Sequence, residues 1–328
     1  MWFERLTGFS EQSPEQVRGN ITVDGVVLTS RVNGRRLICG SLETPSLAEL
    51  RRRVQSGACS FGRTTVREVV ADVRDLHSDE GNAGSLFQVA SQFNLLEMVS
   101  PWVTPERGVG MYENDPTQGP ACAIAAGAGT IYRNYFAPVN GHTGQTAANQ
   151  INCLADIGTA LGNTEGKLWK MQNGYALASE HGLVKISGIL GRLTENERDK
   201  VRELLRVGIQ WNTQVTINDC RHEVSQVYCS AMPVAYAHLS PTLWTDFASL
   251  ILEASYEATF CAAIVNSRYT GNNTLFLTLL GGGAFGNDMD WILRGIQRAI
   301  ETYSDYGLDV AIVSHGSSKR CLRKLITC

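Results

Sequence analysis

The sequence NTLFLTLLGGGAFGNDMDWILRGIQRAIETYSDYGLD occupies residues 273–309 and combines two structural periods. Residues 274–280 form a short apolar run bounded by glycine, which is typical of a buried strand. From Asp290 onward, apolar side chains recur at helical spacing with charged side chains opposite them. Residues 308–314 are again apolar and β-branched. The stretch therefore predicts one strand–helix–strand unit with a glycine-rich turn after its first strand.

A glycine-rich turn that leads from a strand into a helix exposes backbone N–H groups to an anion, and the helix dipole adds to the attraction. A pyrophosphate is the ligand that such a turn would suit. The turn matches neither the P-loop pattern nor the dinucleotide-binding fingerprint. The alternative is a tight turn that binds nothing.

The whole unit resembles the second phosphate-binding loop of macrodomains, and within them the poly(ADP-ribose) glycohydrolase branch. In that branch a strand runs into Gly-x-Gly-Ala-Phe-Gly and then into a helix and the final core strand. The resemblance implies that the loop holds the diphosphate of ADP-ribose and that Phe285 lies against the distal ribose. The residues carried over are Gly281, Gly282, Gly283, Ala284, Phe285, Gly286 and Asn287.

Composition restricts the function classes. The chain has 328 residues, of which 43% are hydrophobic and 19% charged, with a net charge of −3, so we expect neither nucleic-acid nor membrane binding. Its nine cysteines form no C-x-x-C pair, and its six histidines show no ligand spacing. We therefore expect reduced thiols in a cytoplasmic protein that needs no metal and no cofactor.

The pattern along the chain predicts a three-layer α/β domain, macrodomain-like, with a mixed sheet between helices. We expect a β-rich N-terminal extension over residues 1–60, packed on an ADP-ribose-binding domain over residues 61–328. Within the extension the Asn33-Gly34 pair predicts a hairpin. The predicted helices are 47–54, 85–100, 149–161, 195–206 and 244–265, and the further predicted strands are 64–73, 130–136, 215–217 and 224–236. On the longest helix, Glu253 and Glu257 are expected on the outer face.

Residues 64–101 are predicted to repeat the arrangement of strand, glycine-containing loop and helix. In the poly(ADP-ribose) glycohydrolases the corresponding place carries Gly-Gly and then Gln-Glu-Glu, whose second glutamate is the catalytic acid. Here the glutamine is present as Gln88, and Val89 and Ala90 replace both glutamates. The resemblance therefore implies a ligand-binding role for Gln88 but not that family's chemistry at this place.

Residues 104–136 carry a second motif, D-P-T-Q-G-P-A-C-A followed by G-A-G-T-I-Y-R-N-Y-F. Together with S-Q-F-N-L-L-E and G-A-F-G-N, it resembles a divergent macrodomain group that includes an arginine-specific ADP-ribosylhydrolase among bacterial effectors and eukaryotic relatives. The resemblance covers about residues 60–315. It implies that Asn94 and Gln118 also contact ADP-ribose.

Cleavage of an N-glycosidic bond passes through an oxocarbenium-like transition state, which carboxylates near the anomeric carbon stabilise. In the arginine-specific group, acidic residues of this region form the catalytic constellation, and that role is carried over to Asp115, Glu106 and Glu97. Their spacing fits neither a helix nor a strand, so they converge only if the chain folds back on itself. The alternative for each is a surface residue or a helix cap.

These features predict a mono-ADP-ribosylhydrolase that removes ADP-ribose from arginine side chains of proteins. Its partners would be ADP-ribose and the modified protein. Two alternatives remain open. One is a module that binds ADP-ribosylated proteins without hydrolysing them, and the other is a poly(ADP-ribose) glycohydrolase, which the absence of acids at Val89 and Ala90 disfavours.

Overall fold

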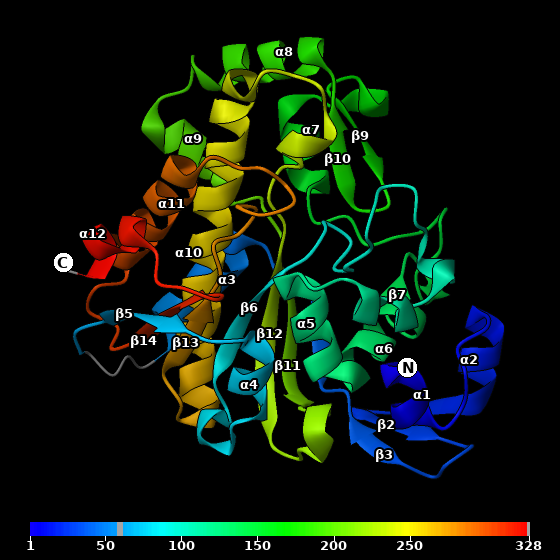
Figure 1. Cartoon of the computed structure of the whole chain (residues 1–328). Helices are drawn as coiled ribbons and strands as arrows, with labels where there is room; N and C mark the ends of the chain where they lie inside the picture. The colour runs from blue at the N-terminus through cyan, green and yellow to red at the C-terminus, as the bar shows by residue number, and fades with distance from the viewer. Residues whose placement is uncertain (58–61, 327–328) are drawn as a thin grey trace.

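The structure is a computed structural model that describes residues 1–57 and 62–326. Its centre is a seven-stranded mixed sheet in the order β4-β11-β12-β6-β13-β14-β5 (Figure 1). The five strands from β12 to β5 are mutually parallel, whereas β11 runs antiparallel to both of its neighbours. Helices cover both faces, so the predicted three-layer α/β architecture is confirmed.

The strands of the large sheet are β4 (Ser41–Glu43), β5 (Thr65–Val70), β6 (Leu86–Ala90), β11 (Gly208–Gln214), β12 (Glu223–Cys229), β13 (Thr274–Leu277) and β14 (Asp309–Ser314). The remaining strands are β1 (Ile21–Asp24), β2 (Val27–Ser30), β3 (Arg36–Ile38), β7 (Pro138–Val139), β8 (His142–Thr143), β9 (Trp169–Gln172) and β10 (Tyr175–Ala178). The helices are α1 (Trp2–Thr7), α2 (Pro14–Asn20), α3 (Leu47–Ser56), α4 (Val73–Ser78), α5 (Gln118–Ala125), α6 (Gly127–Tyr135), α7 (Ala155–Leu161), α8 (Glu180–Leu190), α9 (Glu195–Arg202), α10 (Thr245–Thr270), α11 (Met289–Thr302) and α12 (Arg323–Ile326).

The predicted strand–helix–strand unit is present as β13, α11 and β14. The two strands pair in parallel from Thr274 opposite Asp309 to Leu277 opposite Ile312. Asp288 caps α11, because its side chain accepts a hydrogen bond from the backbone N–H of Asp290. Trp291 and Ile292 on the apolar side of the helix are buried, as the spacing predicts.

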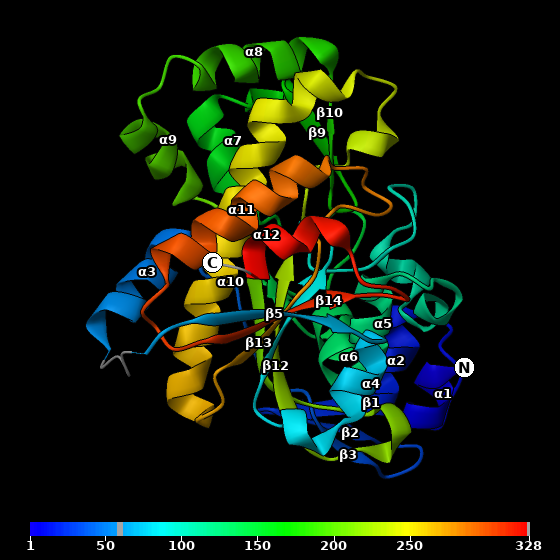
Figure 2. The same cartoon turned by 60° about the vertical axis from the view of Figure 1, so that its left-hand side comes forward.

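One helical layer consists of α3, α10 and α11, and the other includes α4, α5 and α6 (Figures 1 and 2). Helix α10 is the main element of the first layer and packs against β6, β12 and β13. With the short turn before it, α10 is long and apolar enough to cross a membrane, but 89% of its most apolar window is buried inside the protein. These apolar side chains therefore belong to the core.

The predicted helix over residues 85–100 is wrong. Residues 86–90 form β6, which pairs with β12 on one side and β13 on the other, and a loop follows it. A strand in the centre of a covered sheet is apolar on both faces, so its pattern resembles that of a buried helix. Partner strands far away in the sequence decide between the two.

The predicted strand over residues 130–136 is also wrong, because residues 127–135 form α6. Its β-branched and aromatic residues favour a strand, but Gly129 lets the helix approach β11 closely. A Cβ on Gly129 would lie 2.8 Å from Oγ1 of Thr213. Tertiary packing therefore overrides the local preference. The predicted boundaries around α7, α9 and β12 are displaced by several residues. The predicted strand over residues 215–217 is wrong, because β11 ends at Gln214 and a 3-10 turn begins at Ile217.

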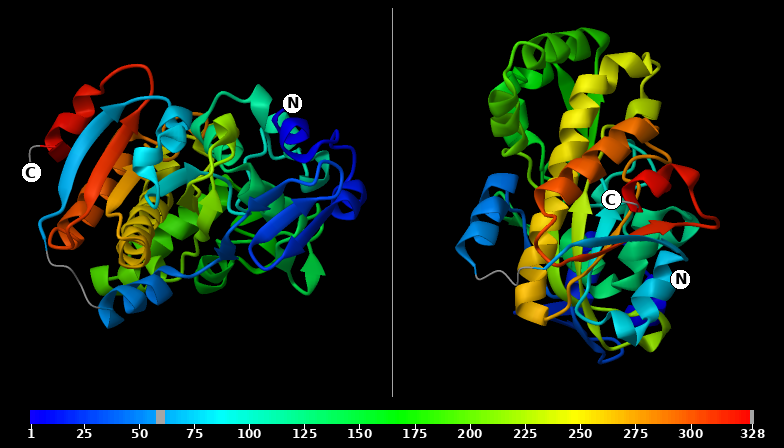
Figure 3. Two further views of the ribbon diagram at one scale, coloured as in Figure 1. Left: turned by 90° about the horizontal axis from the view of Figure 1, so that it is seen from below. Right: turned by 90° about the vertical axis from the view of Figure 1, so that its left-hand side faces the viewer.

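The N-terminal region contains the predicted hairpin, since β2 and β3 pair around the Asn33-Gly34 turn. It also contains α1 and α2, which the sequence did not predict. These elements bury a second hydrophobic cluster at the edge of the molecule far from α12 (Figure 3). In contrast, β4 joins the large sheet and α3 packs on α10. The predicted domain boundary between residues 60 and 61 lies outside the described residues.

All seven cysteines in the described part of the chain carry free thiols. Cys59 and Cys328 lie outside it.

Glu257 was expected on the outer face of α10, and this expectation is wrong. Its side chain is only 2% exposed and bonds two arginines at 2.6 Å each, Arg51 of α3 and Arg298 of α11. The hydroxyl of Tyr303 donates to the same carboxylate at 3.3 Å. A buried charge is tolerated when it is paired in this way. Glu257 therefore joins three helices of one layer.

Replacing Glu257 with glutamine should lower the free energy of unfolding by about 2–3 kcal/mol, because two charge-assisted hydrogen bonds lose their charged acceptor. Urea denaturation measures this. The control is Glu165→Gln, whose carboxylate is 78% exposed and contacts only Lys167 at 3.5 Å, and it should leave the unfolding free energy unchanged. Equal effects of both substitutions would contradict a stabilising role for the buried carboxylate.

Candidate functional site

A groove crosses the carboxyl ends of the parallel strands, where α/β sheets usually bind their ligands. It consists of two adjoining pockets that share Thr117, Gln118, Thr278, Leu279 and Gly283. The first, here called the acidic pocket, includes Glu97 and Asp115. The second, here called the mixed-charge pocket, includes Asp72, Arg74, His315 and Lys319.

The groove opens where β13 separates from β6. The two strands pair only at Leu86 and Phe87, so the main chain of residues 88–90 lacks a strand partner on this side. The side-chain amide of Gln118 replaces that partner: it accepts from the N–H of Ala90 at 2.9 Å and donates to the carbonyl of Gln88 at 2.8 Å. Gln118 therefore supports the floor shared by both pockets. Its amide is already used within the protein.

The glycine-rich loop after β13 is held in a fixed shape. The side-chain amide of Asn287 donates to the carbonyl of Met232 at 2.7 Å, and its backbone N–H donates to the carbonyl of Gly281 at 2.9 Å. Gly281 has a φ of +75°, and a Cβ there would lie 2.4 Å from the Cβ of Ala231. Only glycine fits this position.

The tip of this loop offers hydrogen-bond donors to a ligand. Within the described part of the chain, the backbone N–H groups of Gly283, Ala284 and Phe285 have no acceptor. The N-terminus of α5 adds its positive dipole end from the opposite side of the groove, where Gln118 and Gly119 line the acidic pocket. An anion is therefore favoured at the junction of the two pockets.

Three aromatic rings close one end of the acidic pocket. The ring of Phe285 lies 5.3 Å from that of Tyr175 and 5.5 Å from that of Tyr236. The hydroxyl of Tyr175 donates to the carbonyl of Met98 at 2.6 Å. The sequence predicted Phe285 but missed both tyrosines, because no local pattern relates residues 175 and 236 to the loop.

The loop after β6 carries Glu97 into the acidic pocket. Gln92 fixes the loop, because its side-chain amide accepts from the N–H of Met98 at 2.9 Å and donates to the Met98 carbonyl at 3.3 Å. Leu95 has a φ of +66°, which lets the chain turn back within a few residues. The backbone N–H of Glu97 donates to the Tyr112 hydroxyl at 3.0 Å.

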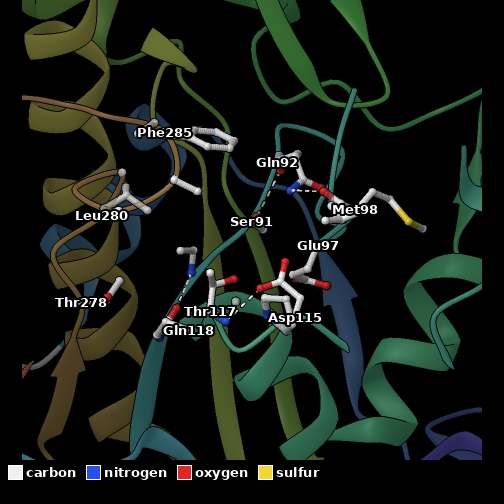
Figure 4. Close-up of a pocket in the computed structure, with 18 of the residues that line it drawn as sticks. Ser91, Gln92, Glu97, Met98, Asp115, Thr117, Gln118, Thr278, Leu280 and Phe285 are labelled. Carbon is white, nitrogen blue, oxygen red and sulfur yellow. Dashed lines mark hydrogen bonds between the residues drawn. The ribbon is translucent and has the colours of Figure 1, made fainter. Parts of the chain in front are cut away.

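Glu97 and Asp115 both face the acidic pocket, across from Leu280 and Phe285 of the glycine-rich loop (Figure 4). The carboxylate of Glu97 is 1% exposed, and burial raises its pKa to about 7 against the opposing charge of Arg133. Asp115 follows a short 3-10 turn over Gly110–Asn114 and accepts from the N–H of Thr117 at 2.9 Å. The structure thus brings together two of the three predicted acids.

Glu106 is the third predicted acid, and it lies outside both pockets. Its carboxylate accepts from the backbone N–H of Ala147 at 2.8 Å on an exposed surface. This hydrogen bond connects the loop that contains Glu106 to the loop that contains Ala147.

Several predicted ligand-binding residues support the groove without lining it. Gln88 on β6 is buried and donates to Thr259 at 3.0 Å. Asn94 donates to Gln150 at 2.9 Å and accepts from the N–H of Leu96 at 3.1 Å. Asn287 and Gly286 shape the glycine-rich loop, and Gly281, Gly282, Gly283, Ala284 and Phe285 line one or both pockets.

The mixed-charge pocket extends the groove toward β14 and β5. Arg74 donates to Asp72 at 2.6 Å and 3.0 Å, and these bonds hold the pKa of Asp72 below its usual value. The sequence gave no signal for Asp72, Arg74 or Lys319. Over residues 1–57 and 62–326, no cluster of three or more histidine, cysteine, aspartate or glutamate side chains is placed to hold a metal ion.

No protein-family model matches the sequence, and no curated protein is similar to it. Solved structures with a similar fold include poly(ADP-ribose) glycohydrolases. A mutant of the Deinococcus radiodurans enzyme in complex with ADP-ribose is 12% identical with a TM-score of 0.47, and the alignment covers 87% of this chain and 94% of that chain. The Thermomonospora curvata enzyme is 12% identical with a TM-score of 0.45, covering 92% of this chain and 89% of that chain.

The shape of the glycine-rich loop is testable by stability. Gly281→Ala should cost about 2–3 kcal/mol of unfolding free energy, because the new Cβ is strained at positive φ and overlaps Ala231. Gly283→Ala, whose Cβ would meet no atom within 4 Å, is the matched control and should change stability by less than about 0.5 kcal/mol. Urea denaturation of both variants decides. Similar stabilities would mean that the loop rearranges freely.

Proposed function

We propose that this protein is a mono-ADP-ribosylhydrolase that releases ADP-ribose from modified arginine side chains. One observation carries the proposal: a single groove has backbone N–H donors at its centre, two carboxylates at one end and a second pocket at the other. ADP-ribose has the matching order of parts, with a central diphosphate between a distal ribose and an adenosine.

The ligand would lie with its diphosphate against the N–H groups of Gly283, Ala284 and Phe285. The distal ribose would enter the acidic pocket, where Phe285 and the two tyrosines limit its movement. The adenosine would occupy the mixed-charge pocket. This orientation places the anomeric carbon on the same side as Glu97 and Asp115.

The reaction is the addition of water to the anomeric carbon with loss of arginine. As the bond between the anomeric carbon and the guanidine nitrogen breaks, positive charge develops on the ribose, and the two carboxylates stabilise it. Asp115 is the proposed general base because it is the more accessible acid. It takes a proton from the attacking water as the C–N electron pair leaves with the guanidine, and then passes that proton to the guanidine nitrogen, so that arginine departs as guanidinium and Asp115 is restored.

Charge also favours arginine as the leaving group. A cationic guanidinium is attracted by two nearby carboxylates, which also match its hydrogen-bonding geometry. A departing glutamate or aspartate carboxylate would be repelled by the same pair. The acidic pocket therefore suits arginine-linked ADP-ribose better than ester-linked ADP-ribose.

The first test is ligand binding. Wild-type protein should bind ADP-ribose in a calorimetric titration, whereas Gly283→Glu should abolish binding, since it places a carboxylate where the diphosphate is expected. Gly283→Ala is the control of the same position and should retain binding. No heat from folded wild-type protein at high micromolar ADP-ribose would overturn the proposal.

The second test is turnover of ADP-ribosyl-arginine protein. Asp115→Asn keeps an acceptor for the Thr117 N–H but loses the charge, so the rate should fall on the order of 10²-fold with little change in ADP-ribose affinity. Glu106→Gln, outside both pockets, should retain the wild-type rate.

Several outcomes of this assay would contradict the proposal. An Asp115→Asn protein with the wild-type rate removes the proposed base. Wild-type protein that releases ADP-ribose from glutamate or serine but not from arginine contradicts the substrate. Tight ADP-ribose binding without any hydrolysis would identify a binding module instead, and cleavage of polymer would identify a poly(ADP-ribose) glycohydrolase.

A further inference from the structure

Arg133 on α6 lies directly behind the acidic pocket and is fully buried, with 0% of its side chain exposed. It lines neither pocket, so no ligand in the groove reaches it. An arginine keeps its charge at any physiological pH, and an unpaired buried charge is costly. Its surroundings should therefore show what compensates that charge.

Every part of the guanidinium is bound. Nε donates to the carbonyl of Leu95 at 3.0 Å, Nη1 donates to the Tyr228 hydroxyl, and Nη2 donates to Oγ1 of Thr130 at 3.2 Å. The guanidinium carbon also lies 3.7 Å from the centre of the Tyr228 ring, a cation–π geometry. All these partners are neutral.

The only carboxylate in contact with Arg133 within the described residues is Glu97, whose two oxygens each lie 3.4 Å from Nη2. The contact is longer than a normal charge-assisted bond, which leaves Glu97 able to interact with the pocket. Because Arg133 also binds the Leu95 carbonyl, it holds both the loop and the side chain that the loop presents.

We infer that Arg133 is a positioning residue of this site, which acts through Glu97 by keeping its carboxylate charged and oriented toward the groove. The inference rests on the proposed function, because it takes Glu97 to be one of the two working acids. The charge and orientation of the Glu97 carboxylate would then depend on an arginine that makes no contact with the substrate.

The other titratable groups near Glu97 do not supply a positive charge. Tyr112 of the 3-10 turn, Cys122 of α5 and Tyr228 of β12 are buried, and burial raises the pKa of each above its usual value. Asp115 lines the same pocket and carries no positive charge. Burial raises the pKa of Glu97, and the charge and hydrogen bond of Arg133 lower it, with a smaller contribution from a hydrogen bond with Tyr112. Removing Arg133 should therefore make Glu97 bind a proton more tightly.

Loss of Arg133 should lower activity at neutral pH. Burial raises the pKa of Glu97 to about 7, so the charged form that stabilises the transition state is lost as pH falls through that value. In Arg133→Met this loss should occur at higher pH by about one unit, which lowers kcat at pH 7 by about fivefold. KM should change little, because Arg133 makes no contact with the groove.

Three variants separate positioning from a general loss of structure. Arg133→Lys keeps a positive charge and should restore part of the acidic limb of the pH–rate profile. Arg202→Met is the control, because it removes another buried arginine. The Arg202 side chain is only 5% exposed, lies outside both pockets and bonds Glu253 at 2.7 Å. Arg202→Met should lower stability without moving the pH profile. If Arg133→Met does not fold, the pH–rate profiles of Arg133→Lys and Arg202→Met are compared instead. The inference then predicts a changed acidic limb in Arg133→Lys only.

A measurement without turnover keeps the inference separate from the proposed function. Infrared difference spectra against Glu97→Gln report protonation of the Glu97 carboxyl as pH is varied. The titration should move to higher pH in Arg133→Met, whether or not the protein hydrolyses anything. If the Glu97 titration of Arg133→Met matches that of the wild type, the inference is overturned. If the titration moves but the wild-type protein shows no hydrolysis, only the proposed function is overturned. A pH–rate profile that is unchanged while KM rises would also overturn the inference.

Discussion

The structure depends on one requirement, which is that the main chain of the central strand β6 must be hydrogen-bonded along its whole length. It lies between two helical layers, where water cannot satisfy an unpaired N–H or carbonyl group. β12 pairs with β6 along one side, but β13 pairs only with Leu86 and Phe87 on the other. The side chain of Gln118 completes the pairing for residues 88–90. This substitution allows the two strands to separate and a groove to exist in the middle of a packed sheet.

Two buried carboxylates differ in how completely neighbouring groups in the protein satisfy them. Glu257 bonds two arginines at 2.6 Å each and lines neither pocket of the groove, so its interactions are complete. Glu97 lies 3.4 Å from a single arginine and has a cavity beside it. Both carboxylates are buried, but of the two only Glu97 borders a cavity in which a ligand could interact with it.

Local signals in the sequence predicted those elements whose stability is mostly local. The unit of β13, α11 and β14 followed from its two periods, and the helix predicted from Glu195 is present as α9, which Thr194 caps. Prediction failed at β6 and α6, where the composition contradicts the local structure. β6 looks helical because both its faces are buried and four of its five residues are apolar, and α6 looks like a strand because it contains Thr130, Ile131 and two tyrosines. In both cases, contacts with distant segments decide the conformation.

The sequence by itself determined the glycine-rich loop and the phenylalanine within it, because a tight turn at positive φ requires specific residues at fixed spacing. It also singled out Glu97 and Asp115, although it grouped them with Glu106. Only the tertiary structure decided that Glu106 faces away, that Tyr175 and Tyr236 surround Phe285, and that Arg133 lies behind Glu97. Those residues are separated from their partners by tens to more than a hundred positions. Their proximity arises from the packing of whole elements, which no local pattern records.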